Sequence, residues 1–342
     1  MPKISDPRTL LEVTNLHVEF NTENGKVRAV DGINFTLNEG EILGIVGESG
    51  CGKSTTAHSI LNLIAPEDGK ITNGEIIFNS QNLLQLSQKE IRKIRGNGIS
   101  MIFQEPNTSL NPVISIGQQI SETIELHLNL AKSQARNHAI KMLEQVGIPD
   151  AKSSMNLYPH QLSGGMQQRV MIAIAMSCSP QLLIADEPTT ALDVTIQAQI
   201  LDLMQDLVTN FHTSLILITH DLGVIARYTH KVAVMYAGKI IEIGSTEDVF
   251  LKSIHPYTLG LINSIPRLDT TQKELLTPID GYPPDLIEIS KGCRFSNRCK
   301  FAYEKCYTDE PLMKKKVDSD GFHQASCWRS EELEILSSVS KK

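Results

Sequence analysis

The feature that most constrains the fold is the segment Gly47-Glu48-Ser49-Gly50-Cys51-Gly52-Lys53-Ser54, which fits G-x-x-x-x-G-K-[ST]. It lies between the apolar run Ile42–Val46, which predicts a buried strand, and residues 55–64, which read as a helix. Glycines in such a turn let several backbone N–H groups point at one anion, so the segment predicts a phosphate-binding loop. We expect Lys53 to bring positive charge to the phosphates and Ser54 to offer its hydroxyl to Mg²⁺. Thr55, the next residue, is expected to contact the nucleotide as well.

Apolar runs alternate with helical patterns along most of the chain. Residues 10–46 read as strands with a turn at Asn24-Gly25, a further strand ends near Phe103, and residues 105–178 read as largely helical. Two more buried strands are predicted at Leu182–Ala185 and Leu215–Thr219, with a helix at about 194–210 between them. Residues 231–243 read as a hairpin around Ala237-Gly238. This alternation predicts an α/β fold with a parallel sheet covered on both faces.

Two carboxylates, Asp186 and Glu187, follow directly on the predicted strand Leu182–Ala185. An acidic pair in such a place is usually a solvated loop or the start of a helix. In a chain with a phosphate loop, however, Asp186 is well placed to coordinate Mg²⁺, and Glu187 to accept a proton from the attacking water. His220 ends the next strand at the same edge, where ligands bind in open α/β folds, so it is a candidate contact for the γ-phosphate.

The charge and the apolar runs of the chain exclude two classes of protein. With 32 basic against 39 acidic side chains and no long basic run, the chain is a poor nucleic-acid binder, so we expect no nucleic-acid partner. The N-terminus lacks the apolar core of a signal peptide, and no apolar stretch approaches the roughly 18 residues that span a bilayer. We therefore expect a cytoplasmic chain that reaches a membrane only through its partners.

A second glycine-rich segment, Leu162-Ser163-Gly164-Gly165-Met166-Gln167-Gln168-Arg169, precedes a helix rich in Met, Ile and Ala. The N-terminus of that helix offers another anion site, and Ser163 can cap the helix or meet a phosphate oxygen. The segment resembles the LSGGQ signature of ABC ATPases, with Met166 where most members have Gln. The resemblance covers about residues 10–255. It implies a P-loop NTPase core with antiparallel N-terminal strands and an inserted helical subdomain, here about 105–178.

The resemblance to ABC ATPases also implies roles for single residues. It places Gln104 at the Q-loop, which serves Mg²⁺ and catalysis, Asp193 at the D-loop, and His220 at the switch histidine. Phe20 takes the place of the aromatic residue that stacks on adenine, although an apolar strand residue would look the same in the sequence. Two domains of this family pack head to tail. Each signature, here Ser163, Gly164, Gly165 and Met166, then covers the ATP of the other domain.

Further segments resemble one subfamily, the ATPases of dipeptide and oligopeptide importers. These segments are Ile102-Phe103-Gln104-Glu105-Pro106-Asn107-Thr108-Ser109-Leu110-Asn111-Pro112, His255-Pro256-Tyr257-Thr258 and the cysteine-bearing tail. The resemblance implies an ATPase at the cytoplasmic face of the cell membrane that powers the uptake of short peptides. Its partners would be a similar second ATPase or a second copy of this chain, two permease subunits and an extracytoplasmic binding protein.

Other functions remain as alternatives to a peptide importer. Near relatives of the subfamily include nickel importers, so nickel or another small solute could be the cargo. Ribosome-associated ABC ATPases usually carry two cassettes, and those of DNA repair insert long coiled coils between the phosphate loop and the signature. This chain has one cassette, and too few residues separate Lys53 from Ser163 for such coils. A metal-sensing protein built around the cysteines is the last alternative.

Four of the six cysteines, Cys293, Cys299, Cys306 and Cys327, lie in the tail. Proline becomes frequent from about Pro266, so we read residues 1–265 as the ATPase domain and 266–342 as a separate C-terminal module. In a reducing cytosol four clustered thiols favour a metal site over disulfides. None of them forms the C-x-x-C spacing common at structural zinc.

Four thiolates can hold a [4Fe–4S] cluster. The importer subfamily resembles this chain around Gly292-Cys293-Arg294-Phe295 and Cys327-Trp328, and some of its members carry such a cluster. A cluster at these cysteines is therefore the expected cofactor besides ATP and Mg²⁺. Zinc, or four free thiols packed as small apolar side chains, are the alternatives. His323 lies close enough in the sequence to compete as a ligand, and we read it as a nearby surface residue.

Overall fold

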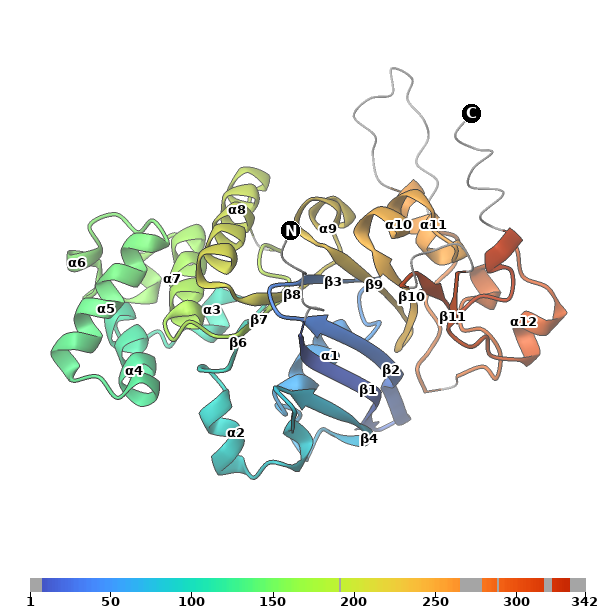
Figure 1. Cartoon of the computed structure of the whole chain (residues 1–342), viewed down its shortest axis with the longest axis horizontal. Coiled ribbons are helices and arrows are strands. Elements are labelled where there is room, and N and C mark those ends of the chain that lie inside the picture. Colours follow the sequence, from blue (N-terminus) through green and yellow to red (C-terminus); the bar gives the residue numbers. More distant parts are fainter. Residues whose placement is uncertain (1–7, 191, 265–278, 288, 317–321, 333–342) are drawn as a thin grey trace, which may run out of the picture. The chain divides into compact units, whose positions relative to one another are not determined.

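A computed structural model describes residues 8–190, 192–264, 279–287, 289–316 and 322–332 of the chain (Figure 1). The chain divides into two compact units. The first unit comprises Met1–Leu10, Leu37–Ile42 and Asn79–Ile218, and the second comprises Leu11–Thr36, Leu43–Phe78 and Thr219–Lys342. The domain boundary expected near Pro266 lies outside the described residues and stays a prediction.

The first unit is built on three parallel strands, β6 (Ile99–Ile102), β7 (Leu182–Asp186) and β8 (Ser214–Thr219). β7 pairs in parallel with β6 and with β8, so it lies between them. All residues of β7 and β8 are buried, as continuous apolar runs require when helices cover both faces of a sheet. The two buried strands predicted at Leu182–Ala185 and Leu215–Thr219 are thereby confirmed.

Helices make up most of the rest of the first unit. They are α2 (Gln88–Ile94), α3 (Pro106–Ser109), α4 (Ile116–Leu128), α5 (Lys132–Gln145), α6 (Ala151–Ser154), α7 (Gly164–Met176) and α8 (Val194–Phe211), with β5 (Gln81–Asn82) and the 3-10 turns η1 (Leu83–Gln85) and η2 (Pro159–Gln161). α4, α5 and α7 pack against one another (Figure 1). Ile120 and Ile124, four residues apart on α4, are fully buried, because that spacing puts both on one face of the helix.

The second unit begins with long antiparallel strands, β1 (Thr9–Thr22), β2 (Gly25–Asn38) and β4 (Gly69–Phe78). β1 lies between β2 and β4, and pairs with β4 from Leu11 opposite Phe78 to Phe20 opposite Gly69. β1 and β2 confirm the strands and the turn predicted in this segment. β4 is a strand that the sequence pattern did not reveal, because Thr72, Asn73 and Gly74 interrupt its apolar residues.

A second group of strands in this unit contains β3 (Ile42–Val46), β9 (Lys231–Tyr236) and β10 (Lys239–Ser245). β3 pairs in parallel with β9, and β9 forms the predicted antiparallel hairpin with β10. Ala237 and Gly238 at its turn both have positive φ, 45° and 83°, which suits a tight hairpin. The helices of this unit are α1 (Lys53–Ile60), α9 (Leu222–Tyr228), α10 (Thr246–Leu251), α11 (Pro256–Asn263) and α12 (Glu304–Thr308).

Helix α1 is shorter than the predicted helix over 55–64, because its C-terminus is closed by a left-handed residue. Asn62 has φ 49°. Its N–H donates to the carbonyl of Ser59, and the N–H of Leu63 donates to the carbonyl of His58. These two bonds form a Schellman motif, which ends the helix and satisfies its last carbonyl groups.

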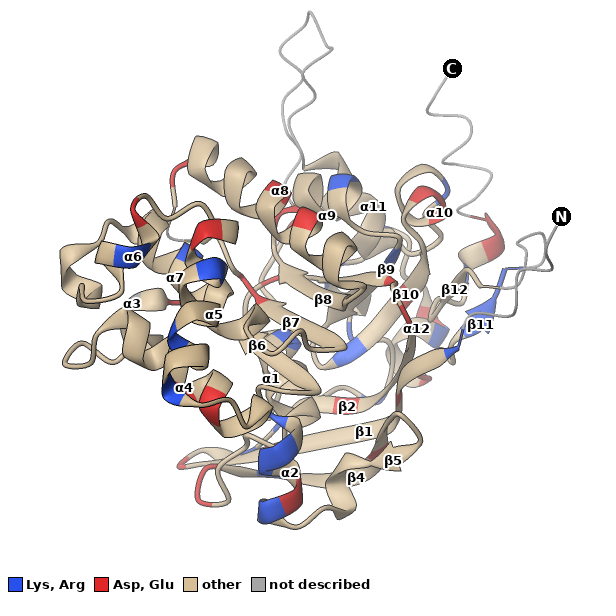
Figure 2. Cartoon of the chain, turned by 60° about the vertical axis from the view of Figure 1, so that its left-hand side comes forward, with Lys and Arg blue, Asp and Glu red and all other residues tan. Residues whose placement is uncertain are grey.

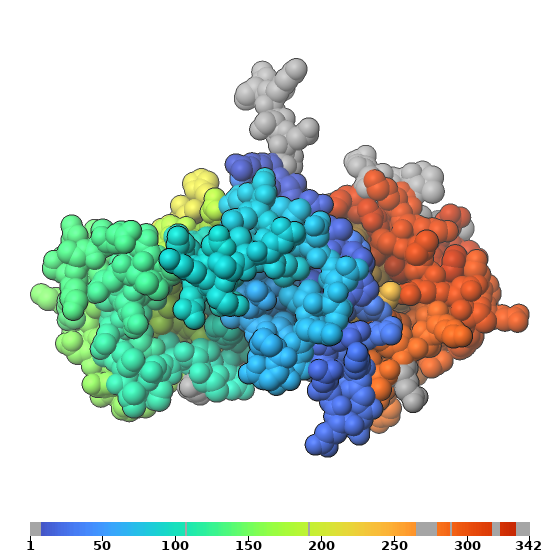
Figure 3. Space-filling model, turned by 90° about the horizontal axis from the view of Figure 1, so that it is seen from below, coloured from blue at the N-terminus to red at the C-terminus, as the bar shows by residue number. Residues whose placement is uncertain are grey.

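The described part of the tail packs against the strands of the second unit. β12 (Gln324–Ala325) pairs with β10, β11 (Lys314–Lys315) pairs with β12, and the 3-10 turn η3 covers Ser296–Arg298. The backbone N–H of Arg28 in β2 also donates to the carbonyl of Leu286. Figure 3 shows these tail residues in orange and red, directly beside the blue N-terminal strands.

The expectation that His323 is a surface residue is wrong. Its side chain is completely buried, and its Nε2 atom donates a hydrogen bond of 2.8 Å to Oε1 of Glu242 in β10. Glu242 is equally buried and also accepts from the hydroxyl of Ser253 and the backbone N–H of Ile254. A buried carboxylate is stable only when it has such hydrogen-bond partners. His323 is one of them, which explains why this histidine of the tail lies in the core.

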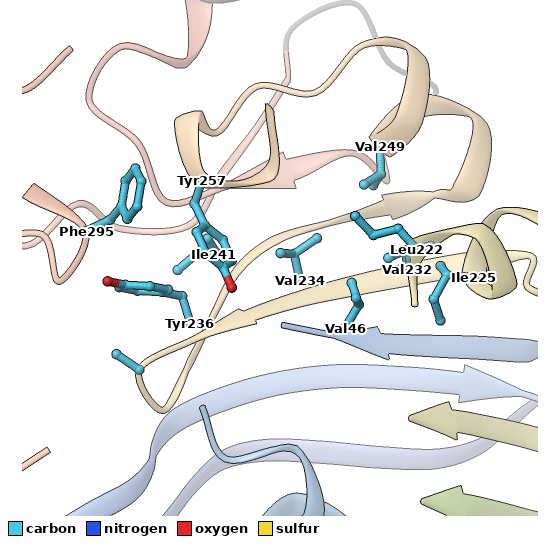
Figure 4. Packing of buried hydrophobic residues seen from close by; sticks show 11 residues of the cluster. Val46, Leu222, Ile225, Val232, Val234, Tyr236, Ile241, Val249, Tyr257 and Phe295 are labelled. Carbon is cyan, nitrogen blue, oxygen red and sulfur yellow. The ribbon is translucent and has the colours of Figure 1, made fainter. Parts of the chain in front are cut away.

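The core of the second unit joins β9 and β10 to helices and to the tail. Val46, Val234, Tyr236, Tyr257 and Phe295 are among its buried residues, and Figure 4 shows the three aromatic rings side by side. Basic and acidic residues are interspersed on the elements in Figure 2. None of the helices that the structure describes is long and apolar enough to cross a membrane.

Candidate functional site

The phosphate loop connects β3 to α1 in the second unit, as the sequence predicts. A side chain at Gly47 would place its Cβ atom 2.1 Å from the carbonyl oxygen of Met235, and one at Gly52 would place it 2.3 Å from the carbonyl oxygen of Ala29. Gly52 also has φ 105°, and Gly50 has φ 78°. The loop therefore requires glycine at these places, both for its left-handed turns and for its close approach to neighbouring backbone.

Lys53 and Ser54 stand at the first turn of α1, directly after this loop. The Nζ atom of Lys53 donates hydrogen bonds to the carbonyl oxygens of Gly47 and Glu48, at 2.8 and 3.0 Å, so the ammonium group lies along the loop. Burial raises the pKa of the Cys51 thiol, which favours its neutral form.

Two residues outside the motif hold Glu48, the second residue of the loop. The backbone N–H of Glu48 donates to the hydroxyl of Tyr257 at 3.0 Å, and its carboxylate forms an ion pair with Arg298, with 2.7 Å from Nη1 to Oε2. Sequence reasoning did not find either contact. Tyr257 was noted only as part of a subfamily segment, and Arg298 lies one residue before Cys299.

Gln104 and Glu187 meet in the first unit. Oε2 of Glu187 accepts a hydrogen bond of 3.1 Å from Nε2 of Gln104 and one of 2.9 Å from the hydroxyl of Thr190. Glu187 has φ 46°, a left-handed conformation that is unusual for a residue with a side chain and is common at functional sites. Asp186 ends β7 just before it and is only 3% exposed. The two carboxylates thus have different surroundings, which suits the two different roles predicted for them.

The signature segment begins helix α7 of the first unit. The hydroxyl of Ser163 accepts a hydrogen bond from the backbone N–H of Met166 at 3.4 Å, so Ser163 is the N-cap that the sequence predicts. Asp193 is the N-cap residue of α8, and its side chain makes no capping hydrogen bond. A Cβ atom on Gly165 would lie 3.0 Å from Ile196 of α8, so the start of α8 lies close to the signature.

Each unit holds its own set of predicted site residues. The first unit contains Gln104, Asp186, Glu187, the signature and Asp193, and the second contains the phosphate loop, Thr55, Phe20 and His220. His220 is exposed and directly follows β8. Phe20 is half-buried on β1 and lies opposite Gly69 of β4. The predicted roles of these residues in nucleotide binding stay predictions.

The four cysteines of the tail converge on one pocket in the second unit. Cys293, Cys299, Cys306 and Cys327 all line it, together with aromatic and proline residues. Burial raises the pKa of Cys293 to about 11 and that of Cys327 to about 12, so without a metal these groups stay protonated. Within the part of the chain that the structure describes, no group of three or more His, Cys, Asp or Glu side chains could hold a metal ion.

Comparison with protein families gives two matches along the chain. A family model described as ABC transporter matches residues 30–190, which include the phosphate loop, the signature, Asp186 and Glu187. A second model, described as the C-terminal region of oligopeptide/dipeptide transporters, matches residues 241–306. That second match includes Tyr257, Arg298 and three of the four tail cysteines.

Among curated proteins, the dipeptide transport ATP-binding protein DppD of Bacillus subtilis (strain 168) is 51% identical over 94% of this chain and 95% of its own length. The oligopeptide transport ATP-binding protein OppD of Salmonella typhimurium is 51% identical over 89% of this chain and 90% of its own length. Among solved structures, an ATP-binding cassette determined as a dimer in a post-hydrolysis state, bound to ADP and Pi, is similar with a TM-score of 0.62 and 27% identity. That similarity covers 69% of this chain and 99% of the cassette. The chain therefore belongs to the ABC transporter family of ATPases, within the group of dipeptide and oligopeptide transport ATP-binding proteins.

Proposed function

We propose that this chain hydrolyses ATP to drive the uptake of dipeptides or oligopeptides through a membrane complex. The observation that carries the proposal is its identity of about one half with dipeptide and oligopeptide transport ATP-binding proteins over nearly its whole length. The match extends beyond the ATPase core into the tail, where the second family model lies. An ATPase of a different transporter class would share the core and not the tail.

The phosphate loop and the strand ends supply the chemical groups that ATP hydrolysis needs. Several backbone N–H groups of the loop and the ammonium of Lys53 bind the phosphates. Ser54 and Thr55, in the first turn of α1, contact the nucleotide, and Phe20 stacks on adenine. Asp186, Ser54 and Gln104 hold Mg²⁺ directly or through water. Glu187 accepts the proton of the attacking water, and His220 contacts the γ-phosphate. The hydrogen bond between Gln104 and Glu187 supports a shared role for these two residues.

The nucleotide is bound between two ATPase subunits in this proposal. Each subunit supplies its phosphate loop to one ATP and its signature, with Ser163, Gly164, Gly165 and Met166, to the other. The capped N-terminus of α7 supports this assignment, since a helix N-terminus favours an anion. Asp193 lies near the signature at the start of α8, where it can contact the partner. ATP thus closes the pair, and hydrolysis releases it.

The remaining partners follow from the same family. They are a second, similar ATPase or another copy of this chain, two membrane-embedded permease subunits, and an extracytoplasmic protein that delivers the peptide. The chain then works at the cytoplasmic face of the membrane, bound to the permeases. Nickel importers are close relatives of this group, so nickel is the competing cargo to exclude.

The cysteine pocket is proposed to hold a [4Fe–4S] cluster. The four cysteines line one pocket, and four thiolates around one site can hold such a cluster. The backbone N–H of Arg329 donates to the sulfur of Cys327, and such bonds stabilise metal-bound thiolates. Cys293, Cys299, Cys306 and Cys327 would hold the cluster, and its bonds to these thiolates would join η3, α12 and the segment after β12. Its role is structural in this proposal, because no electron-transfer partner is indicated.

Reconstitution tests the transport function. The chain is assembled in liposomes with its permeases, its partner ATPase and its binding protein, and ATP is supplied on the side of the ATPase. We expect uptake of labelled di- and tetra-alanine that depends on ATP and on the binding protein, with no uptake of Ni²⁺. Uptake of Ni²⁺ without uptake of peptide would instead identify a nickel importer, and uptake of neither would contradict both.

A further inference from the structure

The phosphate loop is bound by an arginine that lies between two cysteines of the tail. Nη1 of Arg298 is 2.7 Å from Oε2 of Glu48, and Nη2 is 3.0 Å from Oε1. This is the two-point geometry in which a guanidinium binds a carboxylate most strongly. The second position of the loop motif can be any residue, so phosphate binding alone does not explain why Glu48 is held in this way.

Arg298 is itself fixed in place by several neighbours. Its Nε atom donates to the carbonyl of Asp280 at 2.9 Å, and its Nη1 atom also lies 3.3 Å from the hydroxyl of Tyr236. The side chain of Arg298 is only 5% exposed, against 28% for Glu48. An exposed ion pair contributes little because both side chains must be ordered to form it. Here the arginine is already ordered by other contacts, so the pair can hold Glu48 at little further cost in entropy.

A second path joins the same loop residue to the cysteine pocket. The backbone N–H of Glu48 donates to the hydroxyl of Tyr257, a fully buried residue. The ring of Tyr257 packs against that of Phe295, with 5.4 Å between ring centroids (Figure 4). Phe295 lines the pocket beside Cys293 and Cys299. The peptide of Glu48 is thus held by Tyr257, which belongs to the core cluster that Cys293 and Cys299 pack against. Its side chain is held by Arg298, whose guanidinium lies 5.9 Å from the ring centroid of Phe295.

We propose that Arg298 is a positioning residue for ATP binding, which acts through Glu48 and transmits the state of the cysteine pocket to the phosphate loop. The loop binds phosphate with backbone N–H groups, whose directions depend on how its peptides are held. A well-packed pocket keeps Arg298 and Tyr257 in place and so keeps the loop ready for the nucleotide. A disordered pocket releases Glu48 and weakens ATP binding. The inference rests on the proposed role of residues 47–54 in binding ATP.

Arg294 provides a matched control within the same segment of the tail. Its side chain is also 5% exposed and forms an ion pair, but with Asp31 of β2. Its other hydrogen bond goes to the carbonyl of Ala237 in the hairpin turn. Arg294 thus ties the tail to the strands without touching Glu48. Loss of Arg294 tests what general loosening of the tail does to the nucleotide site.

The test is a titration of the full chain with a fluorescent ATP analogue, together with its melting temperature without nucleotide. We expect Arg298→Gln to raise the Kd for the nucleotide about tenfold, within the usual range of coupling between sites. Glu48→Gln should raise the Kd by a similar factor. The variant with both substitutions should have a Kd no higher than that of either single variant. Arg294→Gln should lower the melting temperature at least as much as Arg298→Gln does, and it should leave the Kd within about twofold of wild type. Arg298→Lys, which keeps the charge but not the two-point geometry, should give an intermediate Kd and serves if the glutamine variant does not fold.

The role of the pocket is tested by Cys293→Ser in two backgrounds. In the otherwise wild-type chain this change should raise the Kd about fivefold, and in the Arg298→Gln chain it should add nothing further. The inference would be overturned by a wild-type Kd in Arg298→Gln, or by a Kd in Arg294→Gln that rises as much as in Arg298→Gln. It would also be overturned if Cys293→Ser raised the Kd of the Arg298→Gln chain as much as it raises that of wild type. A wild-type chain that does not bind the analogue would overturn the proposed nucleotide site itself, which is a different outcome.

Discussion

The side-chain amide of Gln104 donates a hydrogen bond of 3.1 Å to the carboxylate of Glu187. Gln104 follows β6 and Glu187 follows β7, and these strands are parallel neighbours, so their carboxyl ends lie at the same edge of the sheet. The amide therefore holds the carboxylate that we assign as the base. Movement of the segment after β6 would therefore move Glu187 or break this hydrogen bond, and if Glu187 is the base, that movement would change the rate of the chemical step.

The first prediction concerns the proton acceptor. Glu187→Gln keeps the size of the side chain and removes its basicity, so we expect kcat for ATP hydrolysis to fall by at least about hundredfold. The Kd for ATP should stay within about threefold of wild type, because the carboxylate handles water and not phosphate. Turnover in the assembled transporter and nucleotide titration measure the two effects. A wild-type rate in the variant would show that another group is the base.

The second prediction separates phosphate binding from catalysis. Lys53→Ala removes the ammonium group that lies along the loop, and hydrogen bonds to a charged group are each worth about 1.5–3 kcal/mol. We therefore expect the Kd for ATP to rise at least about tenfold. The same titration used for Glu187→Gln is the measurement, and that variant is the control, since it should bind normally. Equal binding by the two variants would contradict the assignment of Lys53.

Local features of the site could be predicted from the sequence because each is set by neighbouring residues. The apolar run Ile42–Val46 and the glycines after it are sufficient to specify a strand and a phosphate loop. Ser163 before Gly164 is similarly sufficient to specify a helix cap. In the hairpin, Gly238 supplies the positive φ that the turn needs. In these places a few neighbouring residues determine the local structure, and the structure has the predicted strand, loop, helix cap and turn.

Contacts between distant segments could not be predicted in this way. Glu48 and Arg298 are separated by 250 positions, and neither residue has a pattern around it that identifies the other. The burial of His323 likewise depends on Glu242, a carboxylate on a strand that reads as apolar from its neighbours. A polar side chain such as that of His323 is expected at the surface because its burial is costly. It is inside here because it has a partner from another part of the chain.

The third prediction concerns the pairing of ATPase subunits. With hydrolysis blocked by Glu187→Gln, Mg²⁺ and ATP should convert the chain and its partner ATPase from separate subunits to a stable dimer, measured by size-exclusion chromatography with light scattering. Ser163→Asp is the control. Aspartate caps a helix as well as serine does, so α7 should stay folded, but its charge repels the phosphates of the partner's ATP. The doubly substituted chain should therefore stay monomeric. A dimer that forms equally well with Ser163→Asp would contradict the role of the signature.

The fourth prediction concerns the cysteine pocket. Protein purified without oxygen should be brown and contain about four irons and four sulfides per chain. Cys293→Ser should lose most of the iron, because one of four ligands is gone. Cys178→Ser should keep all of it, since that buried cysteine lies in the first unit and does not line the pocket. Colourless protein with one zinc per chain would support the zinc alternative. Protein without metal would leave four free thiols.

The last prediction concerns pH and His255, the residue before α11. Burial lowers the pKa of His255 to about 4, although the nearby Glu242 acts in the opposite direction. Its Nδ1 atom accepts a hydrogen bond from the backbone N–H of Tyr257 and so caps the helix in the neutral form. In the unfolded chain the pKa returns to about 6.5, so the unfolded state binds a proton first as the pH falls. The contribution of His255 to stability is complete above pH 6.5 and is lost progressively toward pH 4.

His255→Asn is the matched variant, because asparagine can cap the helix and does not titrate. Between pH 7.5 and pH 5.5, the free energy of unfolding of wild type should fall by about 1 kcal/mol more than that of the variant, as the shift in pKa requires. Urea unfolding at both pH values measures the difference, with other titrating groups common to the two proteins. Wild type loses stability at the lower pH because the folded state lowers the pKa of His255. If the folded state instead raised this pKa, wild type would gain stability relative to the variant at pH 5.5. Equal changes in the two proteins would mean that His255 titrates alike in the folded and unfolded chain.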